Sequence, residues 1–456
     1  MSLENLKSAY QSIKKSALDR YFEFIRFESV SSEAEYKDEV LKCADWLDAE
    51  VKKLNFKTTF WQTDNYPVLF AENTEAGPTK PTVLLYGHYD VQPVDPLELW
   101  ESPPFEPTIK GTEVYARGAE DNKGQCSYVL AALEMLQTVH GKYPVNIKLC
   151  IEGEEEIGSP GLLKIVSQHA RELKADHLLI VDVGLEAADK PAITLGVRGL
   201  VTMDVELTGS RGDLHSGANG NLVYNPNRAL VEILAKARDE QGKVLVPGFY
   251  DKVLPVSADE KALINLEFDQ AEYERLVGAK AISGEQPYPL LEAHWLRPTF
   301  EINGIGGGYT GSGFKTVIPA KAIAKISCRL VPNQDPWEIG KLVQEFIEKN
   351  VPEGIECKVT IRPGVGTAVR SSPHTTVAKV LSRAYEEVLG KSCDCILNGA
   401  SIPITAELAK ASGADILLVG YGLIDDNIHA PNEHFGLGRF ENGALTIARA
   451  LELFGE

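Results

Sequence analysis

Residues 83–93, Val-Leu-Leu-Tyr-Gly-His-Tyr-Asp-Val-Gln-Pro, are the stretch from which the fold can be worked out. The apolar run Val83–Leu85 predicts a short buried strand, and His88 and Asp90 stand where that strand ends. In open α/β sheets, ligands bind outside the carboxyl ends of the strands. Taken alone, a His-x-Asp pair is more typical of a structural hydrogen bond than of a site. The ends of the other strands therefore decide the interpretation.

Three further apolar runs predict strands that also end in residue types that bind metals. Residues 145–151 lead into Glu154, Glu155 and Glu156, residues 178–181 into Asp182, and residues 415–420 toward His429. A polar turn at 117–124 carries Asp121 and precedes a predicted helix. Two histidines and several carboxylates on strand ends can converge on one crevice. This mixture of ligands suits zinc first, with manganese and cobalt as alternatives.

The composition narrows the class of protein. A chain of 456 residues predicts two domains, and 44% hydrophobic residues are typical of a soluble globular protein. The net charge of −19 argues against a nucleic-acid partner, because no basic excess neutralises phosphates. Seven scattered cysteines without a Cys-x-x-Cys pair favour reduced thiols. With no signal peptide and no membrane-length apolar run, a cytoplasmic location is expected.

The order of predicted elements indicates an α/β fold with a smaller insertion. Strands and helices alternate up to about residue 195, as in a mixed, mostly parallel sheet covered by helices. A strand-helix-strand-strand-helix-strand order then predicts a ferredoxin-like α+β unit. Between its elements, residues 240–300 are predicted to be polar and irregular. We expect a catalytic domain formed by 1–196 and 367–456, and an inserted lid or dimerisation domain at 197–366.

Several ordered motifs resemble one enzyme family. Tyr-Gly-His-x-Asp-Val-Gln-Pro at 86–93, Arg-Gly-x-x-Asp-x-Lys-Gly at 117–124 and Glu-Glu-x-Gly-Ser at 155–159 are similar to the di-zinc aminoacylase, carboxypeptidase and dipeptidase family. The carnosinase-like and cytosolic non-specific dipeptidases are the branch that the chain resembles most. Residues 213–217 and 315–319 also match this branch, so the resemblance extends over nearly the whole chain.

The resemblance implies two metal ions, each with its own ligands. His88, Asp121 and Asp182 would bind one ion, and Asp121, Glu156 and His429 the other. Asp121 would bridge the two ions, with a cis peptide bond to the next residue. Asp90 would hydrogen-bond His88 and fix the orientation of its ring.

The resemblance also implies roles for four other residues. Glu155 would be the general base that takes a proton from the metal-bridging water and passes it to the leaving amine. Residues 154 and 155 form a Glu-Glu pair as well, but the spacing to Gly158-Ser159 favours 155 as the base. His215 would stabilise the oxyanion, reaching in from the partner subunit. Arg329 would bind the substrate carboxylate, and Ser401 would line the same pocket.

The function we expect is metal-dependent hydrolysis of an amide bond in a small carboxylate-bearing substrate, most simply a dipeptide, by a homodimer joined through the inserted unit. An N-acyl amino acid deacylase is the nearest alternative, because it would share every metal ligand. A catalytically silent binding protein on the same fold would lack a ligand or the base, and this chain lacks none. A two-metal phosphohydrolase is disfavoured by the acidic balance and by the absence of a phosphate-binding loop.

Overall fold

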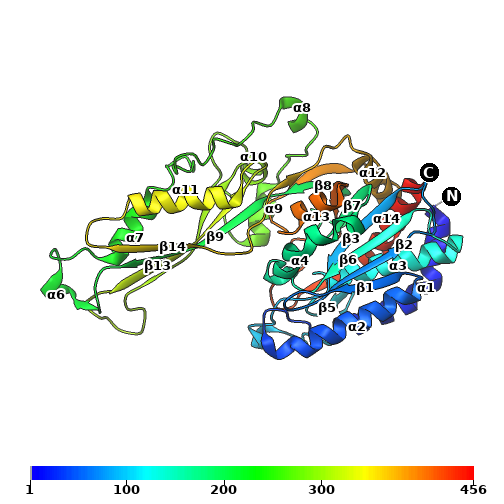
Figure 1. Cartoon of the computed structure of the whole chain (residues 1–456), viewed down its shortest axis with the longest axis horizontal. Helices are drawn as coiled ribbons and strands as arrows, with labels where there is room; N and C mark the ends of the chain where they lie inside the picture. The colour runs from blue at the N-terminus through cyan, green and yellow to red at the C-terminus, as the bar shows by residue number, and fades with distance from the viewer. Residues whose placement is uncertain (1–2) are drawn as a thin grey trace.

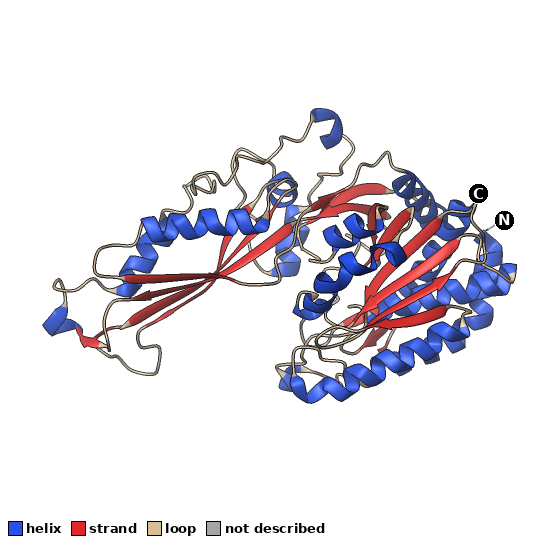
Figure 2. Cartoon of the chain, viewed as in Figure 1, coloured by secondary structure: helices blue, strands red, loops and turns tan. Residues whose placement is uncertain are grey.

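One large mixed sheet organises most of the chain (Figures 1 and 2). The computed structural model describes residues 3–456. In spatial order the main path is β1 (Lys57–Trp61), β2 (Val68–Asn73), β6 (Asn146–Glu152), β3 (Thr82–His88), β7 (His177–Val181), β17 (Asp415–Val419), β8 (Ala192–Val197) and β15 (Val369–Arg370). A further strand, β16 (Asp394–Asn398), pairs with β8. The central strands β6, β3, β7 and β17 are parallel, which confirms the predicted fold class.

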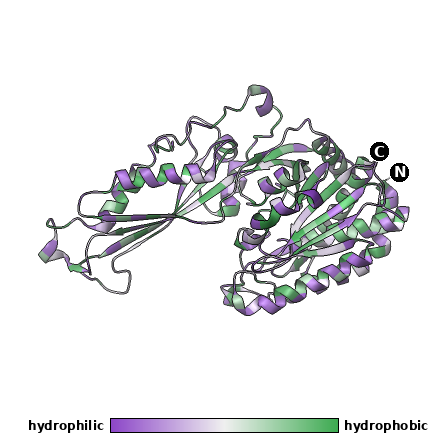
Figure 3. Cartoon of the chain, viewed as in Figure 1, coloured by the Kyte–Doolittle hydropathy of each residue, from purple (hydrophilic) through white to green (hydrophobic). Residues whose placement is uncertain are grey.

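Helices cover both faces of this sheet, so its central strands are buried on both sides and form continuous apolar runs (Figure 3). Residues such as Leu85 and Leu179 pack against one helical layer, and their chain neighbours Leu84 and Ile180 face the other. The first layer contains α1 (Leu3–Ile25), α2 (Lys37–Lys53), α3 (Lys123–His140), α12 (Thr376–Leu389) and α14 (Leu437–Gly455). The second contains α4 (Pro160–Ile165), α5 (Ala170–Leu173) and α13 (Thr405–Ser412).

A second, smaller sheet extends away from the first (Figure 1). Its antiparallel order is β11 (Thr299–Gly307), β13 (Lys321–Leu330), β9 (Gly199–Thr208) and β14 (Glu356–Ile361). Alternate residues of β9 are buried, as expected for a sheet with one covered face. That face packs against α7 (Pro226–Ala235) and α11 (Pro336–Lys349) in a separate hydrophobic core. The chain order β9-α7-β11-β13-α11-β14 is the predicted ferredoxin-like arrangement.

The stretch 240–300 is more ordered than its composition predicts. It contains three short helices, α8 (Ala258–Lys261), α9 (Gln270–Val277) and α10 (Leu290–Leu296). It also returns to the large sheet, where the backbone N–H of Asn265 donates to the carbonyl of Cys395 at 2.8 Å. The three helices are only four, eight and seven residues long, and α8 and α9 bury no side chain, so they leave little periodic apolar signal in the sequence.

Small elements complete the molecule. A three-stranded sheet joins β4 (Thr108–Lys110), β5 (Glu113–Tyr115) and β18 (His434–Gly436). At the far end of the second unit, β10 (Leu214–His215) pairs with β12 (Val317–Ile318) and leads into α6 (Ser216–Asn219). Single 3-10 turns lie at Ala34–Tyr36, Leu97–Leu99, Glu155–Ile157 and Val166–His169. Over residues 3–456, no helix is both long and apolar enough to cross a bilayer.

Candidate active site

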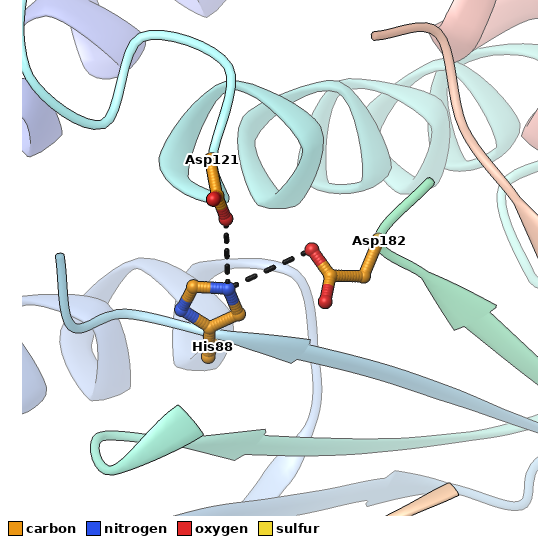
Figure 4. A group of neighbouring side chains, drawn as sticks. All are labelled: His88, Asp121 and Asp182. Atoms are coloured by element: carbon orange, nitrogen blue, oxygen red, sulfur yellow. Dashed lines mark hydrogen bonds and ion pairs between the residues drawn. The ribbon is translucent and has the colours of Figure 1, made fainter. Parts of the chain in front are cut away.

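The carboxyl ends of β3 and β7 bring the first group of predicted ligands together (Figure 4). The Nε2 atom of His88 lies 3.1 Å from Oδ1 of Asp121 and 3.6 Å from Oδ1 of Asp182. These two strands are parallel neighbours, so the residues at their ends share one edge of the sheet. Asp121 enters from the turn that precedes α3, and its peptide bond to Asn122 is cis, as the resemblance implied.

A second group shares Asp121 with the first. The Nε2 atom of His429 lies 2.9 Å from Oδ2 of Asp121 and 3.2 Å from Oε2 of Glu156. Asp121 therefore presents one carboxylate oxygen to each histidine. Within each group the potential ligand atoms lie within 4.8 Å of one another. One histidine and two carboxylates per group are ligands that suit zinc and similar divalent ions.

The two histidines and the neighbouring carboxylates shift one another's pKa values in the direction that favours a proton on each histidine. Hydrogen bonds to Asp121 and Glu156 raise the pKa of His429 to about 11. Burial works to raise the pKa of Asp121, but hydrogen bonds from His429 and His88 outweigh it and lower that pKa. Metal ligands must be deprotonated to bind, so a cation entering either group would displace these protons.

Asp90 supports more of the site than His88 alone. The Nδ1 atom of His88 lies 3.0 Å from the backbone carbonyl of Asp90 and 3.3 Å from its carboxylate. That carboxylate also accepts the backbone N–H groups of Glu155, at 3.2 Å, and Glu156, at 3.1 Å, and the Ser31 hydroxyl at 2.6 Å. Asp90 is fully buried, so it fixes the glutamate turn relative to the end of β3. The sequence indicated only its contact with His88.

The three consecutive glutamates lie in different surroundings. Glu156 contacts His429, whereas Glu154 accepts a hydrogen bond from Asn65 at 2.6 Å. Burial raises the pKa of Glu155 well above its ordinary value, and the nearby charges of Asp182 and Glu156 add to this against the opposing charge of His88. A carboxyl group with a raised pKa beside candidate metal ligands has the character of a general base.

The two residues predicted to bind substrate also lie together. Nη1 of Arg329, at the end of β13, donates to Oγ of Ser401 at 2.7 Å. A residue that the sequence analysis missed, Arg198, joins them, because its Nε donates to the carbonyl of Gly399 at 2.8 Å. Arg198 stands between β8 and β9, and its buried Nη1 has no hydrogen-bond partner among residues 3–456. The only signal for it was its position in Gly196-Val197-Arg198-Gly199, where the chain enters the smaller sheet.

His215 is the one predicted site residue that lies apart from the others. It is exposed and stands beside α6, at the end of the second unit that is remote from the large sheet (Figure 1). Its Nδ1 accepts the backbone N–H groups of Gly217, at 3.0 Å, and Ala218, at 3.3 Å. In the neutral ring Nε2 therefore carries the proton and can donate to a ligand.

Comparison with known proteins agrees with this geometry. Residues 84–453 match the peptidase family M20/M25/M40. The chain belongs to that family. It is 32% identical to the Cys-Gly metallodipeptidase dug1 of Schizosaccharomyces pombe, over 97% of this chain and 96% of that protein. It is 32% identical to the human Beta-Ala-His dipeptidase, over 84% of this chain and 76% of that one.

Solved structures of M20/M25/M40 peptidases have the same fold. The metallo-carboxypeptidase Sso-CP2 of Sulfolobus solfataricus superposes with a TM-score of 0.88 at 34% identity, covering 96% of this chain and 99% of that one. The predicted resemblance to the dipeptidase branch is confirmed, and the chain is a metallopeptidase of this family.

Proposed function

We propose that this M20/M25/M40 peptidase cleaves the peptide bond of dipeptides with two divalent metal ions, zinc first and manganese or cobalt as alternatives. The shared carboxylate of Asp121, with one oxygen toward His88 and the other toward His429, carries this proposal. The printed names of two relatives, a Cys-Gly metallodipeptidase and a Beta-Ala-His dipeptidase, support the substrate class.

Each residue of the site would have a definite task in the reaction. Bound ions would lower the pKa of the attacking water and polarise the scissile carbonyl. Glu155 would accept the proton of that water and transfer it to the leaving amine. Arg329, beside Ser401, would hold the free carboxylate of the substrate through its planar guanidinium group. Asp90 would keep Glu155 in place through the backbone contact described above.

The inserted unit, residues 197–366, would serve as a lid and as the contact of a homodimer. Two exposed apolar residues, Leu222 and Phe314, lie on the segments next to α6 and β12, near His215, and Phe314 is 91% exposed. A second copy of the chain would cover them. Because His215 is remote from the metal ligands of its own chain, it would donate Nε2–H to the oxyanion of the partner's substrate.

A cytoplasmic location is part of the same proposal. All seven cysteines are free, and four of them are buried. Buried thiols without disulfides are typical of proteins in a reducing compartment.

An N-acyl amino acid deacylase is the second candidate. Such an enzyme would use the same metal ligands and would bind a substrate carboxylate in the same way. The metal centre therefore does not distinguish the two activities. They differ in the group on the amine side of the scissile bond.

Metal analysis combined with a substrate panel tests the proposal. We expect two divalent ions per chain, loss of activity on chelation and recovery when zinc, manganese or cobalt is added back. Dipeptides should be hydrolysed, whereas their carboxamide analogues should react poorly because Arg329 would have no carboxylate to bind. Turnover of N-acyl amino acids alone would refute the dipeptidase assignment, and full activity without metal would refute the mechanism.

A further inference from the structure

A buried carboxylate outside the two ligand groups organises the turn that carries Asp121. Glu433 is fully buried, and its Oε1 accepts the backbone N–H groups of Glu120, at 3.0 Å, and Asp121, at 3.1 Å. Its Oε2 accepts the N–H of Gly118 at 2.9 Å and Nη1 of Arg117 at 2.7 Å. One side chain thus satisfies four donors of a single turn, and one of those donors belongs to Asp121 itself.

The guanidinium of Arg117 connects this turn with two other loops of the site. Its Nη2 donates to the carbonyl of Pro93 at 2.9 Å, in the segment that follows Asp90, and lies 3.4 Å from the carbonyl of Ala430, next to His429. Arg117 is almost completely buried. Carbonyl groups from two loops and a carboxylate therefore converge on one rigid planar group.

The loop that carries His429 needs such support. Asn427, His429 and Asn432 all have positive φ, of 56°, 60° and 65°. Asparagine adopts this backbone readily, but it is unfavourable for His429 and persists there only where the surrounding contacts determine it. Glu433 directly follows this loop, so its contacts with residues 117–121 hold one end of the loop against the turn of Asp121.

We propose that Arg117 and Glu433 are positioning residues that set how Asp121 stands between His88 and His429. This inference rests on the proposed function, because it takes Asp121 as the ligand shared by two ions. A shared carboxylate must direct one oxygen to each side, so a small rotation of its turn weakens both groups together. A buried ion pair such as Arg117–Glu433 contributes little to the free energy of unfolding, since removing its charges from water offsets much of their attraction.

The test compares two substitutions of the same chemistry. Glu433→Gln keeps the size of the side chain, but its amide NH2 would point at donors that now meet a carboxylate oxygen. Glu452→Gln is the matched control, because Glu452 also forms a buried ion pair, with Arg449 at 2.9 Å. The control pair lies on α14 near the C-terminus, where it contacts none of the residues proposed as ligands.

The readout is binding of Co²⁺ to the metal-free proteins, measured by calorimetry and by the visible absorption of the bound ion. For Glu433→Gln we expect a loss of affinity of about 10–100-fold at both positions, and a changed Co²⁺ spectrum. Arg117→Lys should show a smaller change in the same direction. Glu452→Gln should keep wild-type affinity and spectrum, even if its melting temperature falls.

The outcomes separate the two proposals. If wild type itself binds no Co²⁺, the proposed function fails. If wild type binds two ions and Glu433→Gln binds them with the same affinity and spectrum, the positioning role is refuted. Equal loss of Co²⁺ affinity in Glu433→Gln and Glu452→Gln would also refute it, because the effect would then reflect general destabilisation.

Discussion

Two glutamates three residues apart, one at the end of β6 and one in the turn that follows, lie in different surroundings. Glu155 lies beside Asp182 and Glu156 at the candidate metal centre. Glu152, at the end of β6, is buried and accepts hydrogen bonds from Tyr86, at 2.7 Å, and from Ser159, at 2.9 Å. We propose the first as the proton acceptor, whereas the second is closed off from solvent.

Glu155→Gln should lower kcat by about 10²–10⁴-fold while both metal ions stay bound, because only the base is removed. Steady-state kinetics and metal analysis of the same preparation check this. Turnover close to that of wild type would exclude Glu155 as the base.

Glu152→Gln should change how stability depends on pH. Burial raises the pKa of Glu152 to about 8, from 4.5, despite the hydrogen bonds from Tyr86 and Ser159. Between these two values the folded state holds a proton that the unfolded state releases, so stability falls as pH rises, by up to about 1.4 kcal/mol per pH unit.

Glutamine imitates the neutral carboxyl group and removes this slope. The melting temperature of wild type should fall between about pH 5 and about pH 8. For Glu152→Gln this fall should be smaller, by about 2–4 °C. The same decline in both proteins would show that Glu152 is ionised in the folded state.

At the scale of elements, glycines let the ends of β7 and β17 approach closely beside Asp182. A Cβ on Gly420 would lie 1.6 Å from the backbone carbonyl of Val183, and one on Gly184 would lie 2.3 Å from the carbonyl of Gly422. Backbone from both strands fills this space, so a side chain cannot be accommodated by a change of rotamer.

Gly420→Ala should consequently separate the two strand ends. We expect a loss of about 1–3 kcal/mol in the free energy of unfolding, and weaker metal binding because Asp182 directly precedes Val183. Gly438→Ala, in α14, is the control, since a Cβ there meets no atom within 4 Å. Denaturant unfolding and metal titration of both variants provide the measurement. Equal stability of the two variants would contradict this account of the strand ends.

At the scale of the whole molecule, the two units divide the predicted site between them. The candidate metal ligands lie at one edge of the large sheet, while His215, beside α6, lies at the far end of the smaller unit (Figure 1). If His215 completes the active site, the simplest arrangement is a two-fold dimer in which His215 of each chain contacts the active site of the other chain.

Co-expression of His215→Ala with Glu155→Gln tests this arrangement. Each variant alone should be nearly inactive, although both should retain metal. Random pairing in a two-fold dimer gives mixed dimers with one intact site, so activity should recover to about a quarter of the wild-type level. No recovery in a verified mixed dimer would place His215 in the site of its own chain.

Local patterns predicted much of the fold and the residues of the two candidate ligand groups. The apolar runs before His88, Asp182 and His429 are strands because their residues are buried on both faces, and such strands produce an uninterrupted signal. The helices between residues 240 and 300 gave no such signal, because they are at most eight residues long and two of them bury no side chain.

By itself, the sequence determined the α/β class, the inserted ferredoxin-like unit and the residue types that gather at the strand ends, because burial and strand direction follow from local periodicity. Only the tertiary structure decided which atoms meet. It brought Glu433 onto the turn of Asp121, placed Arg198 on the loop that Arg329 also contacts, and left His215 remote from the candidate ligands of its own chain. These relations join segments far apart in the chain, and side-chain distances of this kind leave no local pattern.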